Sequence, residues 1–178
     1  MPAKRISPRE RLRVEQIYAR LTECYPEVRC TLEYKNPFQL LVMTILAAQC
    51  TDARVNQVCR TLFQQYVSPA DFVAAPPGAL EEAIRSCGFF NQKARSIRES
   101  SAILLAEHEG EVPSSMEALL RLPGVGRKIA NVVLGECFGE PSVVVDTHCM
   151  RVSRRLGFTK NTTPEKIEED LMQYWLRE

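Results

Sequence analysis

Leu122-Pro-Gly-Val-Gly-Arg-Lys128 is the stretch of this sequence that decides its fold. Its two glycines lie between apolar helical patterns, and glycine permits the positive φ angles and close backbone approach that a tight turn between helices needs. The helix that begins near Arg127 presents unsatisfied N–H groups and the positive end of its dipole at its start. The pattern therefore predicts a helix-hairpin-helix at about residues 114–138, with an anion site at the turn.

An aspartate follows the hairpin, 18 residues after Lys128, at the end of an apolar run. This apolar run could bring the Asp146 carboxylate close to the glycine turn in space. Lys128 lies on the helix face opposite Ile129, Val132 and Val133, so its amine is expected to be accessible. An amine can attack C1′ of a sugar as a base departs and form a Schiff base, and a carboxylate can stabilise the charge that develops. We therefore predict that Lys128 and Asp146 are a catalytic pair.

Each of these features also has a plainer interpretation. Gly-x-Gly between helices can be a tight connection only, Lys128 can bind phosphate without a catalytic role, and Asp146 can be the N-cap of the helix that follows. Capping and catalysis are compatible, because a capping carboxylate is held rigidly. The flanking Leu-Pro and Arg-Lys favour a DNA-binding hairpin, whose candidate phosphate contacts are Gly124, Val125, Gly126 and Arg127.

Helical periodicity dominates the rest of the chain. Apolar residues recur at helical spacing in segments 38–46, 55–63, 80–87, 92–108, 127–138 and from 163 onward. Thr51 is a candidate N-cap, and Ser114 with Glu117 three residues later fits a capping box. Only Ser142–Val145 reads as a possible strand, and it is too short and isolated to build a sheet. The sequence predicts an all-α chain of short helices.

Length and charge narrow the class of protein. The 178 residues, 45% of them hydrophobic, suffice for one or two small domains, and no apolar run reaches the roughly 18 residues of a membrane span. The net charge is only +1, but residues 1–20 and residues 121–160 each carry a net +4. The excess of positive charge in residues 121–160 surrounds the hairpin and Asp146, as expected for a patch that faces phosphate. The alternative is an ordinary solvated surface.

The cysteines predict no disulfide framework and no metal site. Their odd number, seven, and scattered positions without a Cys-x-x-Cys pair favour a reducing, intracellular compartment. Cys59, Cys87 and Cys137 fall on apolar helix faces, where a small buried side chain is the expected role.

Several segments together resemble the endonuclease III family, the bifunctional DNA glycosylases of the helix-hairpin-helix superfamily. These are the hairpin with its step to Asp146, Pro37-Phe-Gln-Leu-Leu41, Leu46-Ala-Ala-Gln-Cys-Thr-Asp-Ala-Arg-Val-Asn56, Gly88-Phe-Phe-Asn-Gln-Lys-Ala94 and Val145-Asp-Thr-His-Cys-Met-Arg-Val-Ser-Arg-Arg-Leu-Gly157. The resemblance covers about residues 10–175. It implies removal of oxidised pyrimidines from duplex DNA, then cleavage 3′ to the abasic site by β-elimination, with Lys128 as Schiff-base nucleophile and Asp146 as essential carboxylate.

The resemblance also assigns DNA contacts. Gln49 and Phe89 match residues that the family inserts where the damaged nucleotide has been flipped out. An amide can hydrogen-bond the orphaned base, and an aromatic ring can wedge between stacked bases. A glutamine at the edge of the core and a phenylalanine on the surface are the alternatives. Thr147 and His148 are further candidate DNA contacts, and His148 is expected to pack locally or contact the backbone rather than ligate a metal.

The implied architecture is an all-α, two-lobed helix-hairpin-helix glycosylase fold with the substrate cleft between the lobes. A helical barrel over residues 30–142 carries the hairpin, and residues 1–29 with 143–178 form the second lobe. The expected partner is damaged double-stranded DNA, without membrane association. The protein is expected to be a monomer in the cytoplasm, associated with a bacterial nucleoid.

The cofactor is where this sequence departs from the family. Relatives usually end with four cysteines, spaced Cys-x6-Cys-x2-Cys-x5-Cys, that ligate a [4Fe-4S] cluster, and no such set occurs here. The family position would lie beyond residue 178. We expect a chain shortened at its C-terminus, with no cofactor in the residues present, and a natural form that lacks the cluster is the alternative.

Two rival functions remain open. A monofunctional mismatch glycosylase of the same superfamily keeps the aspartate but usually lacks a lysine at the position of Lys128. A non-catalytic DNA-binding module would use the hairpin alone and would leave the placement of Asp146 unexplained.

Overall fold

The computed structural model describes residues 6–175, and all regular secondary structure in that range is helical. The all-α class expected from the sequence is confirmed for these residues. The chain divides into two compact units, one formed by Cys30–Glu140 and the other by Met1–Arg29 with Pro141–Glu178. The larger unit therefore contains the hairpin, and the smaller one contains Asp146. Each helix within residues 6–175 is too short or too polar to span a lipid bilayer.

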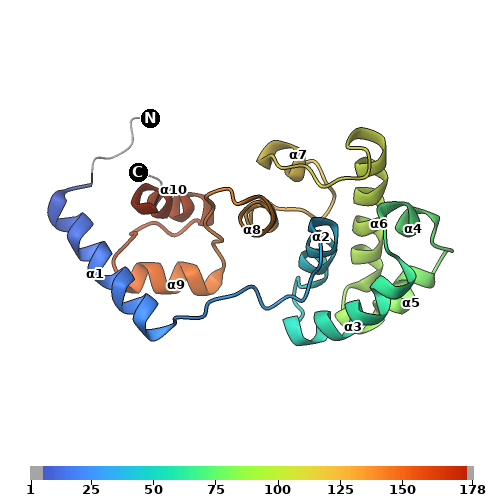
Figure 1. The fold of residues 1–178 in the computed structure, drawn as a ribbon, viewed down its shortest axis with the longest axis horizontal. Coiled ribbons are helices and arrows are strands. Elements are labelled where there is room, and N and C mark those ends of the chain that lie inside the picture. Colours follow the sequence, from blue (N-terminus) through green and yellow to red (C-terminus); the bar gives the residue numbers. More distant parts are fainter. Residues whose placement is uncertain (1–5, 176–178) are drawn as a thin grey trace. The chain divides into compact units, whose positions relative to one another are not determined.

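The larger unit is built around α2 (Pro37–Leu46), whose residues are all buried after the first. A helix that is apolar on every side belongs in the interior, which explains its central place. Asn36 starts it by accepting a hydrogen bond from the Gln39 N–H, and Pro37 occupies the first turn. Figure 1 shows three helices packed around it: α3 (Asp52–Gln65), α6 (Phe90–Glu107) and α8 (Arg127–Phe138).

Short helices complete this unit. They are α4 (Pro69–Ala74), α5 (Ala79–Ala83), the 3₁₀ helix η1 (Arg85–Cys87) and α7 (Met116–Leu120). Helices α4 and α5 pack on α6, and α7 packs on α8 as the first helix of the hairpin.

The helix starts confirm one expected cap and correct another. Thr51 caps α3 as expected, since its side chain accepts from the Arg54 N–H. The cap of α7 is Ser115, which accepts from the Ala118 N–H at 3.3 Å, so the assignment to Ser114 was wrong by one residue. Glu117 then lies too close to the cap to complete a capping box.

The smaller unit consists of α1 (Pro8–Cys24), α9 (Thr147–Arg155) and α10 (Pro164–Trp175). Val14, Val145, Phe158, Ile167 and Leu171 form its core. Helix α1 was not predicted from the sequence, and Val14 is its only buried residue.

A local signal at the start of α1 was available. Ser7 caps the helix by accepting from the Glu10 N–H, and Pro8 follows as its first residue. The possible strand at Ser142–Val145 was wrong: the segment forms no ladder with any described residue and serves as an extended connection.

Arg13 fastens α1 to the connection between α9 and α10. Its guanidinium donates to the Leu156 carbonyl at 2.7 Å and to the Gly157 carbonyl at 3.1 Å, and it lies 5.7 Å from the centroid of the Phe158 ring. Glu10 completes the arrangement by accepting from Arg13 at 2.7 Å. This hydrogen bond lowers the pKa of Glu10 below its usual value of 4.5. The stabilisation from the carboxylate is therefore complete above pH 4.5 and is lost as the pH falls through the lowered pKa.

We predict that Arg13→Met destabilises the smaller unit by about 1 kcal/mol, because methionine keeps the aliphatic packing but loses the donors. Hydrogen exchange should then be faster in α1, while exchange in α2 stays unchanged. Arg11→Met, at an exposed position of the same helix, is the matched control. Equal effects of the two substitutions would show that the carbonyl contacts of Arg13 contribute nothing.

Candidate functional site

The hairpin turn lies directly against α6. Gly124 has a φ of +81°, and a Cβ atom placed on it would lie 2.9 Å from the Cβ of Ser96. Ser100, one turn further along α6, donates from its hydroxyl to the Pro123 carbonyl at 2.9 Å. The turn closes on itself through a hydrogen bond from the Val125 N–H to the Leu122 carbonyl. Glycine is therefore required at position 124 both by conformation and by contact.

The start of α8 is open toward solvent. Gly126 is the N-cap residue and, as a glycine, contributes no side-chain capping bond. A Cβ atom on Gly126 would meet no described atom within 4 Å. Arg127 and Lys128 follow in the first turn, and both are exposed, so the expected accessibility of Lys128 is confirmed. Backbone N–H groups, the positive end of the helix dipole and two exposed cationic residues thus occur together in the first turn of α8, which suits a phosphate.

Asp146 caps α9. Its side chain accepts from the Cys149 N–H at 2.8 Å, and the residue is half-buried behind the buried Val145. The capping interpretation is therefore correct, and the bond fixes the carboxylate at the helix start. Burial, and secondly the charge of Asp146, raise the pKa of the Cys149 thiol, so that thiol stays neutral.

Thr147 and His148 are exposed in the first turn of α9. The Nδ1 atom of His148 lies 3.1 Å from a guanidinium nitrogen of Arg151. Further basic side chains of this region line an open hollow of about 690 Å³ together with Thr147, namely Arg151, Arg154, Arg155 and Lys160. These four cations belong to the basic excess of residues 121–160, and the spacing of Arg151, Arg154 and Arg155 along α9 already indicated a common basic face.

Gln49 and Phe89 are exposed, and both adopt a left-handed backbone conformation, with φ of 53° and 47°. Such angles are uncommon outside glycine and are frequent at ligand-contacting positions. The Phe89 side chain is 64% exposed, an unusual position for a large apolar ring. Phe89 also precedes α6 directly, so that helix begins at Phe90 rather than near Gln92. These two residues present their side chains outward, as an insertion role requires.

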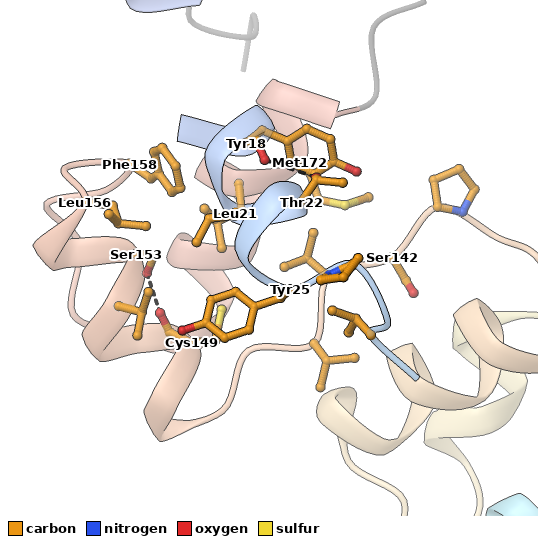
Figure 2. A pocket seen from close by; sticks show the side chains of 17 residues that line it. Tyr18, Leu21, Thr22, Tyr25, Ser142, Cys149, Ser153, Leu156, Phe158 and Met172 are labelled. Atoms are coloured by element: carbon orange, nitrogen blue, oxygen red, sulfur yellow. Dashed lines mark hydrogen bonds between the residues drawn. The ribbon is translucent and has the colours of Figure 1, made fainter. Parts of the chain in front are cut away.

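The smaller unit also contains an apolar pocket of about 860 Å³ (Figure 2). Tyr18, Leu21 and Tyr25 line it from the side of α1, and Cys149 and Ser153 line it from α9. The Ser153 hydroxyl donates to the Cys149 carbonyl at 2.6 Å. Neither a carboxylate nor an amine lines the pocket, so it offers no group for amine attack on a sugar and no carboxylate to stabilise a developing positive charge.

The described residues form no group of three or more histidine, cysteine or acidic side chains that could hold a metal ion. All seven cysteines are free thiols. Cys59 and Cys87 are buried, as expected, and Cys137 is partly buried. Burial raises the pKa of Cys59 to about 12, in keeping with a core residue.

The predicted site residues fall into two groups. Gln49, Phe89 and residues 124–128 belong to the larger unit, and Asp146 with its two neighbours belongs to the smaller one. In the larger unit, residues 124–128 lie together at the start of α8. In the smaller unit, Asp146, Thr147 and His148 lie together at the start of α9. The pairing of Lys128 with Asp146 stays a prediction.

Comparison with known proteins gives one consistent result. The model of the HhH-GPD superfamily of base excision DNA repair proteins matches residues 42–177. Endonuclease III of Synechocystis sp. is 49% identical over 162 residues, which is 90% of this chain and 74% of that protein. Endonuclease III of Bacillus subtilis is 42% identical with the same coverage of both chains. A solved structure of a trapped endonuclease III–DNA covalent intermediate matches with a TM-score of 0.88 at 42% identity, covering 92% of this chain and 78% of that one.

We predict that Gly124→Ala destabilises the larger unit by about 1–3 kcal/mol, because alanine is strained at this φ and its Cβ would overlap Ser96. Urea unfolding of both proteins measures the difference. Gly126→Ala is the control, since its φ of −95° is ordinary and the space beside it is open. The control should keep nearly full stability but bind duplex DNA more weakly, since its methyl group occupies the anion space. Equal stability of the two variants would contradict the close-approach argument.

Proposed function

This chain belongs to the endonuclease III family of the HhH-GPD superfamily, and from that premise we propose that Lys128 is its nucleophile and Asp146 its essential carboxylate. The family activity is that of a DNA glycosylase and abasic-site lyase in base excision repair. The single observation that carries the residue assignment is an exposed lysine in the first turn of α8, directly after a turn whose N-cap residue is Gly126. We further propose oxidised pyrimidines in duplex DNA as the substrate class.

The hairpin binds the DNA backbone. A phosphate oxygen accepts from N–H groups at the start of α8, and Arg127 adds charge. Contacts of this kind fix the position of the duplex without reading its sequence, which suits an enzyme that must search all DNA for damage. They also bring a sugar close to Lys128.

Lys128 carries out the substitution at the sugar. Its neutral amine attacks C1′ while the bond from C1′ to the base breaks, and the base leaves with a proton. Ring opening then gives a Schiff base between Nζ and C1′. Loss of a C2′ proton allows the C3′–O bond to break, so the 3′ phosphate departs, and water finally hydrolyses the Schiff base to release the enzyme.

Asp146 acts on the charge that develops at the sugar. As the base leaves, C1′ becomes positive, and a fixed carboxylate stabilises it without reorganisation. The same group can accept or relay a proton from the amine. The capping bond from the Cys149 N–H supports this role, because it holds the carboxylate in one orientation. The proposal requires Lys128 and Asp146 to act on one nucleotide.

Further DNA contacts follow from exposure and charge. We assign insertion into the base stack to Gln49 and Phe89, and backbone contact to Thr147 and His148. The basic hollow of α9 supports the last assignment, because its four cations lie beside Thr147. A monofunctional mismatch glycosylase and a non-catalytic hairpin module are the alternatives; neither needs an exposed amine at position 128.

The family's [4Fe-4S] cluster finds no fitting ligands among residues 6–175. The thiols are spread over both units, with Cys24 and Cys149 in the smaller one, and they form no ligand group. No step of the proposed reaction involves the cluster. The free thiols support a proposed location in the cytoplasm, where the substrate would be nucleoid DNA.

We predict that borohydride traps a covalent adduct between this protein and a duplex with an abasic site, and that Lys128→Ala abolishes it. Reduction converts the Schiff base to a stable amine, so gel mobility and mass report the adduct. Lys166→Ala, at an exposed lysine of α10, is the control and should trap normally. A Lys128→Ala protein that still traps at the wild-type rate would refute the nucleophile assignment.

We also predict that Asp146→Asn lowers single-turnover base excision by about 100-fold or more, with little change in the Kd for DNA. Asparagine is as good an N-cap as aspartate, so the stability of α9 should be kept. Excision kinetics, DNA binding and thermal unfolding separate the three effects. Parallel losses of excision and binding would assign Asp146 a structural role only.

A further inference from the structure

A buried lysine of α6 contacts both segments that carry the candidate inserting residues. Lys93 is only 5% exposed. Its ammonium donates to the Leu46 carbonyl at 2.8 Å and to the Cys87 carbonyl at 2.6 Å. Its backbone N–H also donates to the Phe89 carbonyl at 3.1 Å. Lys93 therefore donates to three backbone carbonyls. They belong to two segments, at Leu46 and at Cys87–Phe89, that are about 40 residues apart in the sequence.

Both side-chain acceptors are helix ends. Leu46 is the last residue of α2, and Cys87 is the last residue of η1. Carbonyl groups at a helix end lack partners within the helix and carry the negative end of its dipole, so a cation is favourable there. Lys93 takes part in none of the ion pairs among the described residues. The two carbonyls therefore provide its main electrostatic compensation.

The neighbouring thiol does not replace them. Burial, and then contact with Cys50, raise the pKa of Cys87 to about 11, so it is a neutral thiol at physiological pH. A buried ammonium is costly unless well bonded, and an apolar side chain of similar length would fill the same space at lower cost. What the ammonium provides in place of apolar packing is a contact that joins two backbone segments.

The joined segments lead directly to the exposed pair. Gln49 lies three residues after Leu46, and Phe89 lies two residues after Cys87. Both have positive φ angles, which persist only where the surrounding structure holds them. Without the shared ammonium, the ends of α2 and η1 could shift independently, and a shift of about 1 Å at a site of this kind can cost up to about 100-fold in rate.

We propose that Lys93 is a positioning residue that sets the separation of Gln49 and Phe89, so that both side chains enter the base stack at the flipped-out nucleotide. This inference rests on the proposed function. It predicts a defect confined to substrates whose nucleotide must be extracted from a duplex. An abasic sugar in a single strand needs no extraction, so its reaction with Lys128 should not depend on Lys93.

The test compares Lys93→Met, which keeps the length of the side chain without its donors, with Lys93→Arg, which keeps the charge. Leu104→Ala, a core deletion three turns along the same helix, is the control for general destabilisation. Each protein is assayed for single-turnover excision from a duplex with one oxidised pyrimidine. Each is also assayed for borohydride trapping on a single-stranded abasic oligonucleotide. Circular dichroism and thermal unfolding establish that the proteins assayed are folded.

We expect Lys93→Met to lose about tenfold or more in duplex excision while single-strand trapping stays within about twofold of the wild type. Lys93→Arg should recover part of the duplex rate, and Leu104→Ala should keep both activities below its unfolding temperature. Duplex excision by Lys93→Met within about twofold of the wild type would overturn the proposal. Equal losses on both substrates would overturn it as well, since they indicate a general structural defect.

A double-mutant cycle measures the coupling between Lys93 and Gln49 and is a second test of the proposal. If Lys93→Met is only partly folded, Lys93→Arg is used in the cycle instead. If Lys93 acts through Gln49, its substitution should have a smaller effect in a Gln49→Ala protein than in the wild type. Fully additive losses would contradict the inference. Failure of the proposed function can be distinguished from failure of the Lys93 proposal. If the function is wrong, the wild-type protein itself shows neither excision nor trapping, and no variant needs to be compared.

Discussion

The close approach of Gly124 to Ser96 is the constraint on which the rest of the candidate site depends. It seats the hairpin turn on α6 and thereby fixes where α8 begins and where Lys128 projects. The same helix carries Ser100, which bonds the Pro123 carbonyl, and Lys93, which bonds the ends of α2 and η1. These positions recur at helical spacing, so one face of α6 organises three loop segments through side-chain contacts to backbone. The exposed groups of the larger unit that are proposed to meet DNA thus rest on the buried face of one helix.

In the smaller unit, too, one residue serves both the fold and the candidate site. Asp146 terminates an extended connection and begins α9, so the residue proposed for catalysis is also a structural cap. Its carboxylate is oriented by a helix start rather than by a flexible loop, as an electrostatic role requires. Arg13 in turn ties α1 to the far end of α9, which keeps the core around Val145 covered. Stability and function therefore share side chains here, and a substitution at Asp146 must be judged on both.

Local patterns made much of the fold predictable. The glycine turn, the apolar run of α2 and the Thr51 cap each depend on a few neighbouring residues, and the structure confirms them. The cap of α7 was misplaced because two adjacent serines fit the same local rule. Lys93 could not be found from sequence, since lysine is rarely buried and its acceptors come from segments distant along the chain. The roles of Lys128 and Asp146 remain predictions, because they depend on a shared substrate rather than on either helix start alone.

The most direct measurement is identification of the residue that bears the sugar. The borohydride-reduced complex with an abasic duplex can be digested with protease and nuclease and the modified peptide sequenced by mass spectrometry. We predict that the deoxyribose remnant is attached to Nζ of Lys128, within the peptide that begins after Arg127. A remnant on another lysine or on the N-terminal amine would contradict the assignment of the hairpin lysine as the nucleophile.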